Sequence, residues 1–241
     1  MWPFSKKEAS LFCLEVDVHS HLIPAIDDGV ESLDETIEII TQLGKLGIRK
    51  VITTPHIIQD HYPNTREIIE SGLERVRNAL NERGINNVTI EAAAEYYFDD
   101  SFVKRIDSGE ELMTFGKGFV LIETAFMNKP IALQEVFFQL ISNGYIPVLA
   151  HPERYSYLYQ NIEELVELRE MGVKIQVNAF SLIGHYSQDS RLFAEQLINK
   201  GMVDFLGSDI HRPRHIILYK RMLKSSLFHK CRQLSLLNNS L

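Results

Sequence analysis

The sequence predicts an α/β fold, specifically a distorted seven-stranded (β/α)7 barrel of the TIM type. Seven short apolar segments alternate with longer amphipathic segments along the 241 residues, which is the pattern of parallel strands and crossover helices. Most of the amphipathic segments end at a glycine just before the next strand. Histidine, aspartate and glutamate follow the strand ends, where the side chains of a barrel converge. One domain accounts for the whole chain, because α/β barrels commonly have about 200–250 residues.

The predicted strands are short and read as buried on both faces, as parallel strands do. We expect them at residues 12–18, 50–54, 88–93, 119–122, 146–150, 173–177 and 204–207. No strand is followed by a glycine-rich turn of the nucleotide-binding type, which favours a closed barrel over an open nucleotide-binding sheet.

The predicted helices follow the strands in turn. Within residues 32–46, apolar residues recur every three or four positions, Ser32 and Glu35 match a capping box, and Gly47 ends the helix. The other helices are expected at residues 65–83, 100–108, 131–143, 162–171, 188–200 and 215–228. Residues 1–11 are expected to be a leader outside the barrel, and residues 227–241 a peripheral tail.

The composition indicates a cytoplasmic globular protein. The net charge of −7 disfavours binding to nucleic acid or to an anionic lipid surface. No apolar segment approaches the roughly 20 residues of a membrane span, and the start of the chain lacks the apolar core of a signal peptide. Two cysteines far apart in the sequence are no disulfide framework, which fits a reducing compartment.

Side chains that bind metals stand at the ends of six of the seven predicted strands. His19 and His21 are two residues apart at a strand end, so they point to the same side and can bind one ion together. The other candidates are Asp27, Asp28, His56, Glu95, Glu123, His151, Asp209 and His211. A single histidine is more often structural, but so many in register with the strand ends indicate one shared site. Imidazole and carboxylate ligands without thiolate suit Mn, Fe or Zn, and their number predicts several ions that share a bridging carboxylate.

Four motifs carry a resemblance to a known family. They are DVHSHLIPAIDDG at residues 17–29, TPH at 54–56, HPER at 151–154 and SDIH at 208–211. Through them the chain resembles the PHP (polymerase and histidinol phosphatase) superfamily and, within it, the bacterial capsule-type manganese-dependent protein-tyrosine phosphatases. The resemblance covers about residues 15–214, and it implies the same seven-stranded barrel that the strand count predicts independently.

The resemblance implies a centre of two to three metal ions, expected to be manganese, with iron or zinc as alternatives. The first ion would bind His19, His21, Glu95 and Asp209; the second would bind Glu95, Glu123 and His151; the third would bind Asp28, His56 and His211. Glu95 would therefore bridge two ions. Asp28 is preferred to Asp27 because it lies directly before Gly29.

The resemblance also implies how the reaction proceeds. Metal-activated water would attack the phosphate, and arginine would bind the phosphoryl oxygens through its planar guanidinium group. Arg154 is expected to be the first arginine. The sequence departs from the family pattern after His211, where Arg214 is expected to be the second arginine and Arg212 is the alternative. Asp209 or a metal-bound water would protonate the leaving group.

A cysteine nucleophile is excluded by spacing. A cysteine-dependent tyrosine phosphatase needs an arginine six residues after the cysteine, but the residue six after Cys13 is His19 and the residue six after Cys231 is Leu237. Cys13 is expected to be a buried strand residue.

The expected function is a protein-tyrosine phosphatase that acts on an autophosphorylated bacterial tyrosine kinase of capsule or exopolysaccharide synthesis. Tyr96, Tyr97 and Phe98 either stack on the aryl group of the substrate or pack the barrel rim. The alternatives are a small-molecule phosphatase such as histidinol phosphatase, a nuclease module of the same superfamily, and a non-catalytic binding module. The sequence leaves open the oligomeric state, a homo-oligomer included. The remaining histidines are expected at the surface or behind the ligands: His61, His185, His215 and His229.

Overall fold

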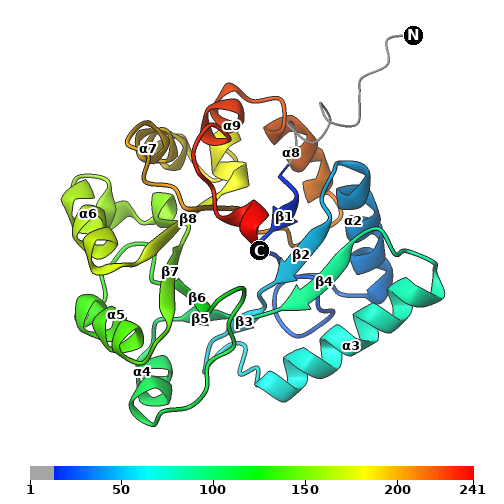
Figure 1. The fold of residues 1–241 in the computed structure, drawn as a ribbon, viewed down its shortest axis with the longest axis horizontal. Helices are drawn as coiled ribbons and strands as arrows, with labels where there is room; N and C mark the ends of the chain where they lie inside the picture. The colour runs from blue at the N-terminus through cyan, green and yellow to red at the C-terminus, as the bar shows by residue number, and fades with distance from the viewer. Residues whose placement is uncertain (1–13) are drawn as a thin grey trace.

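The computed structural model describes residues 14–241. Within them the strands form a ring and the helices cover its outside (Figure 1). The strands are β1 (Val16–Asp17), β2 (Lys50–Thr53), β3 (His56–Ile57), β4 (Thr89–Ala92), β5 (Glu95–Tyr97), β6 (Phe119–Glu123), β7 (Ile146–Ala150), β8 (Lys174–Asn178) and β9 (Phe205–Gly207). The helices are α2 (Leu33–Lys45), α3 (Arg66–Glu82), α4 (Asp100–Asp107), α5 (Leu133–Ser142), α6 (Ile162–Met171), α7 (Gln188–Asn199), α8 (His215–Met222) and α9 (Ser226–Cys231). The predicted α/β fold with parallel strands is confirmed.

The strands belong to two parallel sheets, in the orders β1-β2-β4 and β3-β5-β6-β7-β8-β9. Short interruptions separate the sheets, because β2 and β4 each stop for two residues before β3 and β5 begin. At the first interruption the Thr53 hydroxyl takes part in the pairing: it donates to Ser20 O and accepts from Leu22 N, each at 2.9 Å. A parallel bridge between Ser20 and Ile210 joins the chain after β1 to the chain after β9.

The helices and strands follow the predictions with two differences. The segments β3 and β5 continue beyond the predicted strands, and they place His56 and Glu95 on strands rather than after them. The last predicted helix is divided into α8 and α9. Residues 1–13, with the predicted leader and the strand position of Cys13, lie outside the described part of the chain.

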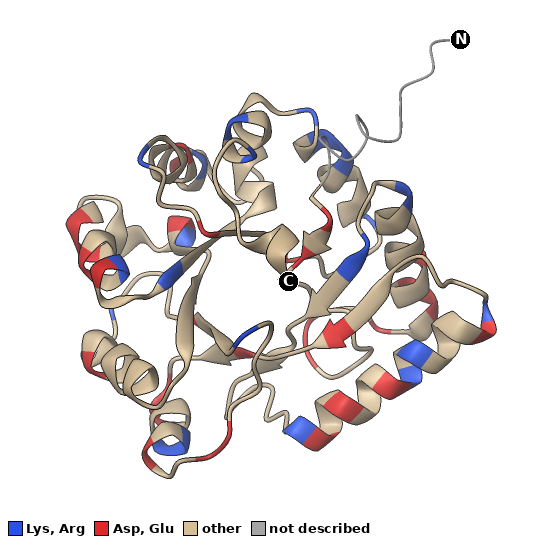
Figure 2. Cartoon of the chain, in the orientation of Figure 1, with Lys and Arg blue, Asp and Glu red and all other residues tan. Residues whose placement is uncertain are grey.

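The helix ends follow the local signals that the sequence carries. Ser32 caps α2 by accepting a hydrogen bond from Glu35 N at 3.3 Å, and Thr65 caps α3 in the same way. The Glu35 carboxylate accepts from Glu31 N at 2.7 Å, one residue earlier than a capping box requires. Acidic and basic residues are interspersed along α3, which gives this helix a mixed polar surface (Figure 2).

The end of the chain lies against the strands instead of forming the expected peripheral tail. The C-terminus lies near the centre of the ring in Figure 1. Asn238 is fully buried; its amide donates to Val16 O and Leu206 O, and its oxygen accepts from Leu206 N, at 2.8 to 3.0 Å. Leu237 and Leu241 pack on an apolar cluster that includes Phe205. The tail therefore covers the end of the ring where β1 and β9 begin, and the predicted metal ligands lie at the opposite end.

Within residues 14–241, none of the helices combines the length and the apolar character that crossing a membrane requires.

Candidate metal centre

All nine predicted metal ligands meet at the carboxyl ends of the strands. Their nitrogen and oxygen atoms form four overlapping groups, and the atoms of each group lie within 4.8 Å of one another. The groups are His21 with Asp28, His56 and His211; His19 with His21 and Glu95; His19 with His151 and Asp209; and His56 with Glu95 and Glu123. These groups contain every residue of the predicted set, but the overlap allows more than one division among separate ions.

Glu95 lies at the centre of the cluster and is buried, with 1% of its surface exposed. Its Oε2 atom is 3.2 Å from His19 Nε2, 3.4 Å from His21 Nε2 and 3.1 Å from His56 Nδ1. Its Oε1 atom is 3.1 Å from His151 Nε2. Both carboxylate oxygens therefore face imidazole nitrogens, as a bridging ligand requires.

Glu123 and Asp28 extend the cluster on two sides of Glu95. Glu123 Oε1 lies 3.5 Å from His151 Nε2. Asp28 Oδ1 lies 3.3 Å from His211 Nε2 and 3.6 Å from His56 Nε2. Asp28, and not Asp27, thus faces the histidines expected for the third ion.

The orientation of two histidines shows why this cluster fits a cation. The Nδ1 atoms of His19 and His21 face acceptors: Gln176 Oε1 at 2.9 Å and Asp27 Oδ2 at 2.7 Å. Each Nδ1 therefore carries the proton, and in a neutral imidazole Nε2 then has the lone pair. The two Nε2 atoms lie 3.3 Å apart. When the imidazoles are neutral, these lone pairs face each other and the carboxylates, an arrangement that either protons or a divalent cation would stabilise.

The charges within the cluster lead to the same conclusion. Burial alone would lower the pKa of His19, but the Glu95 and Asp209 carboxylates raise that pKa to about 9. The burial of Glu95 opposes ionisation, yet His19 and His56 hold its pKa well below the usual value. Burial and the charge of Glu95 raise the pKa of Glu123 well above its usual range. Despite burial, the pKa of His21 is also raised, by Asp27, whereas burial lowers the pKa of His56 and lowers that of His151 to about 4. Protons on His19 and His21 thus balance the carboxylates, and metal binding would release them.

The two oxygens of Asp209 face different partners. Its Oδ1 atom lies 3.4 Å from the Nε2 atoms of His19 and His21. Its Oδ2 atom accepts from Asn178 Nδ2 at 2.7 Å, and from Arg154 Nη1 and the Tyr186 hydroxyl at 3.2 Å each. Although Asp209 is buried, the neighbouring histidines hold its pKa well below the usual value. These contacts favour an ionised ligand over a proton donor.

Two predicted ligands have strained backbones. His151 and Asp209 have φ angles of 31° and 55°, in the left-handed region that residues other than glycine seldom adopt. Such strain gathers at functional sites, where the surrounding structure fixes it. At these positions it turns both side chains toward the cluster directly after β7 and β9.

Asp27 and Gln176 support the cluster from behind. The sequence places Gln176 between the apolar residues Ile175 and Val177 of β8, and this buried polar side chain is the signal that could have identified it. It accepts from His19, and its own amide donates to Val177 O at 2.8 Å, which fixes the orientation of its oxygen. Asp27 accepts from His21 Nδ1 and also from His56 N at 3.1 Å.

Asp27→Asn tests this support. An amide oxygen is a weaker hydrogen-bond acceptor for His21 Nδ1 than a carboxylate oxygen is. Loss of the hydrogen-bond partner of a metal-ligating histidine usually lowers metal affinity by about 10–100-fold. We expect a decrease in that range, measured by competition with a chelator of known affinity. Asn64→Ala, which removes hydrogen bonds to Ile26 O and His56 O near the same loop, is the control for loss of loop order. Equal metal affinity in Asp27→Asn and wild type would contradict the role.

A pocket of about 300 Å³ opens over the cluster. Arg154 lines it, together with three aromatic residues, Tyr62, Phe126 and Tyr186. These three, rather than the aromatic residues after Glu95, line the pocket. The sequence offered no local signal for them, since they lie in loops after three different strands. His185 and His215 also line the pocket, whereas His61 and His229 are exposed elsewhere.

The aromatic residues that follow Glu95 have other contacts. Tyr96 is buried, and its hydroxyl accepts from Met113 N at 2.8 Å. Phe98 packs edge-on against Phe102 at the rim. Tyr96 and Phe98 therefore pack within the protein, which was one of the two roles expected for the aromatic residues after Glu95.

The two candidate second arginines differ in their surroundings. Arg212 donates to Gly29 O at 2.6 Å and lies 3.2 Å from Glu31 Oε1, so it contacts the loop that carries Asp28. Arg214 is exposed where α8 begins, and it is not among the residues that line the pocket.

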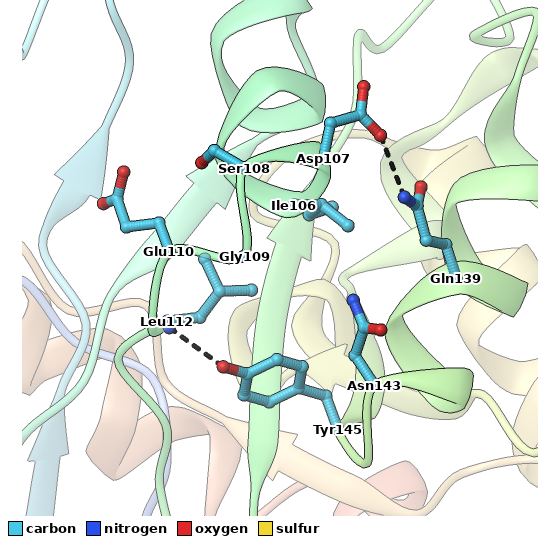
Figure 3. A pocket seen from close by; sticks show the side chains of 9 residues that line it. All are labelled: Ile106, Asp107, Ser108, Gly109, Glu110, Leu112, Gln139, Asn143 and Tyr145. Atoms are coloured by element: carbon cyan, nitrogen blue, oxygen red, sulfur yellow. Dashed lines mark hydrogen bonds between the residues drawn. The ribbon is translucent and has the colours of Figure 1, made fainter.

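A second hollow, of about 420 Å³, lies between α4 and α5 (Figure 3). Gln139 donates to Asp107 across it at 2.8 Å, and the Tyr145 hydroxyl accepts from Leu112 N at 3.1 Å. None of the four metal-binding groups found within residues 14–241 lies there.

Comparisons with known proteins agree with this geometry. The profile of the family described as capsular polysaccharide synthesis, CpsB/CapC, matches residues 15–220. CapC of Staphylococcus aureus is 29% identical over 198 residues, which is 81% of this chain and 76% of CapC. The tyrosine-protein phosphatase YwqE of Bacillus subtilis is 28% identical over 196 residues, 81% of this chain and 77% of YwqE.

Solved structures give two further matches. One comes from a study of YwqE from Bacillus subtilis and CpsB from Streptococcus pneumoniae, described as unique metal-dependent tyrosine phosphatases. It superposes with a TM-score of 0.75 at 25% identity, over 89% of this chain and 90% of that chain. Histidinol phosphate phosphatase from Lactococcus lactis has a TM-score of 0.52 at 13% identity, over 87% and 92%, and shares the fold.

Proposed function

Because the chain belongs to the CpsB/CapC family of capsular polysaccharide synthesis, we propose that it is a metal-dependent protein-tyrosine phosphatase. The observation that carries the proposal is the buried cluster of imidazoles and carboxylates whose lone pairs face one another, with Arg154 3.2 Å from Asp209 at its edge. A cluster of this kind needs cations, and a guanidinium beside it suits a phosphate monoester.

The two sheets, on this proposal, are one distorted seven-stranded barrel. The continuations β2 to β3 and β4 to β5 support it, since they carry the strand order from one sheet to the other. The Ser20–Ile210 bridge supports closure between the first and last strands. A barrel brings ligands from all strand ends to one mouth.

The proposed ligands keep the division expected from the sequence. His19, His21, Glu95 and Asp209 would hold one ion; Glu95, Glu123 and His151 a second; Asp28, His56 and His211 a third. Manganese is proposed, since nitrogen and oxygen ligands without thiolate suit it, with iron and zinc as alternatives. Such ions, when bound, neutralise a phosphate dianion and supply an activated water.

The protein's own groups bind and orient the substrate. Arg154 is proposed to hold two phosphoryl oxygens, because a guanidinium presents two N–H groups in one plane. The open pocket admits a side chain that projects from a protein, as phosphotyrosine does. Arg214 is proposed as the second arginine. We further propose that the substrate is an autophosphorylated tyrosine kinase of exopolysaccharide synthesis, in the cytoplasm.

Inhibitor sensitivity and substrate preference test the proposed function. Cys231 is buried, and burial raises the pKa of its thiol to about 12, so it is not poised as a nucleophile. We expect thiol alkylation to leave activity unchanged, a chelator to remove it, and added Mn²⁺ to restore it. kcat/KM should favour phosphotyrosine peptides over phosphoserine peptides and histidinol phosphate.

Two outcomes would contradict the proposal at different levels. A preference for histidinol phosphate would overturn the tyrosine-phosphatase assignment and leave the metal chemistry in place. Activity that survives chelation but is lost on alkylation would overturn both.

A further inference from the structure

Two aromatic rings lie against the guanidinium group of Arg154. Its Cζ atom lies 4.2 Å from the centre of the Tyr186 ring and 4.6 Å from the centre of the Phe126 ring. Cations are attracted to the faces of such rings, and arginine also stacks on them through its plane. Arg154 has 21% of its side chain exposed, although it lines the pocket, so most of its surface is in contact with the protein.

Three loops bring these side chains together. Arg154 follows β7, Phe126 follows β6, and Tyr186 lies between β8 and α7. The Phe126 loop is tied to the Arg154 loop, because Ser156 N donates to Phe126 O at 2.8 Å. The Tyr186 hydroxyl donates to Asp209 Oδ2 at 3.2 Å, the same oxygen that accepts from Arg154 Nη1. Tyr186 thus contacts both the proposed phosphate-binding arginine and a proposed metal ligand.

The contact with Asp209 is made through one guanidinium nitrogen, Nη1, and by itself it does not fix the plane of the group, since Arg154 could turn about it. Bidentate binding of phosphate requires a defined plane. The rings supply that restriction, and Arg154 still lines the pocket.

We propose that Tyr186 is a positioning residue, which together with Phe126 fixes the guanidinium plane of Arg154 for phosphate and couples it to Asp209. This inference rests on the proposed function, because it takes Arg154 as the group that binds the phosphoryl oxygens. The ring of Tyr186 orients the arginine, and its hydroxyl adds a hydrogen bond that holds Asp209 Oδ1 toward the histidines.

Binding of inorganic phosphate to the manganese-loaded protein, measured by calorimetry, tests the proposal independently of turnover. Tyr186→Leu should weaken phosphate binding by about tenfold, the effect expected for loss of a partly buried cation–π contact. Tyr186→Phe, which keeps the ring, should change it by less than about threefold. Tyr159→Leu is the matched control, since Tyr159 packs on Phe193 away from the pocket, and should bind phosphate as wild type does.

A double-mutant cycle separates positioning from general damage. In the Arg154→Lys background, Tyr186→Leu should weaken phosphate binding by a further factor of less than about two, because the guanidinium that Tyr186 positions is gone. Additive effects in the cycle, or equal losses in Tyr186→Phe and Tyr186→Leu, would overturn the proposal. If Tyr186→Leu does not fold, Phe126→Leu replaces it with the same expectations. Wild-type protein that neither binds phosphate nor hydrolyses phosphotyrosine would instead overturn the proposed function.

Discussion

Glu95→Gln should lose most of the activity and part of the bound metal. Glu95 places both oxygens within 3.4 Å of imidazole nitrogens from four histidines, so a neutral amide weakens two ion sites at once. Loss of a single supporting partner typically costs about 10–100-fold in metal affinity or activity, and a bridging ligand should cost more than about 100-fold. Metal content by elemental analysis and kcat on a phosphotyrosine peptide are the measurements.

Glu91→Gln is the matched control for Glu95→Gln. Glu91 lies on β4, where its carboxylate pairs with Lys50 at 2.8 Å and is 48% exposed. Glu91→Gln should leave the metal content and the kcat unchanged. Wild-type metal content and activity in Glu95→Gln would show that Glu95 does not bridge the ions.

Arg154→Lys should lower kcat/KM strongly while metal content stays near wild type. Lysine keeps the charge but loses the planar pair of N–H groups and the stacking between Phe126 and Tyr186. Each charge-assisted hydrogen bond contributes about 1.5–3 kcal/mol, so a loss of roughly 10–100-fold is expected. Arg77→Lys, remote from the pocket, where Arg77 donates to Ile90 O, is the control. Activity equal to wild type in Arg154→Lys would exclude the proposed role.

A comparison of Arg212→Ala with Arg214→Ala then identifies the second arginine. Arg214 is proposed to reach the phosphoryl group, so its removal should lower kcat/KM with unchanged metal content. Arg212 contacts the Asp28 loop through Gly29 O, so its removal should act through metal affinity instead. The reverse pattern would assign the phosphate contact to Arg212.

The sequence could predict the ligand cluster because parallel strands bring their carboxyl ends to one place. His56, Glu95, Glu123 and His151 each follow a strand predicted from the sequence, so their positions in the sequence already imply their proximity. The spacing of His19 and His21 similarly implies a shared side. The choice of Asp28 over Asp27 as the ligand rested only on its position directly before Gly29. The structure places Asp28 Oδ1 3.3 Å from His211 Nε2, whereas Asp27 accepts a hydrogen bond from His21 Nδ1.

The other features of the site and the course of the chain end depend on contacts between segments that are distant in the sequence. Such contacts leave no local pattern in the sequence. Tyr186 reaches Arg154 and Asp209 from a loop whose course the sequence does not define. Tyr96, directly after Glu95, was an equally good candidate for the pocket but is buried against Met113 N. Asn238 lies in the segment predicted to be a peripheral tail, yet its amide donates hydrogen bonds to the backbone oxygens of Val16 and Leu206. The residue types alone do not show which of these side chains are buried and which line the pocket.

The metal content of the purified protein tests the central claim most directly. Protein prepared without chelator should contain about two to three divalent ions per chain by elemental analysis, as a multinuclear hydrolase does. Anomalous scattering from crystals should place them among His19, Glu95, His151 and Asp28. Removal of these ions should abolish phosphotyrosine hydrolysis, and their return should restore it. Full activity in protein with less than one ion per chain would contradict the account.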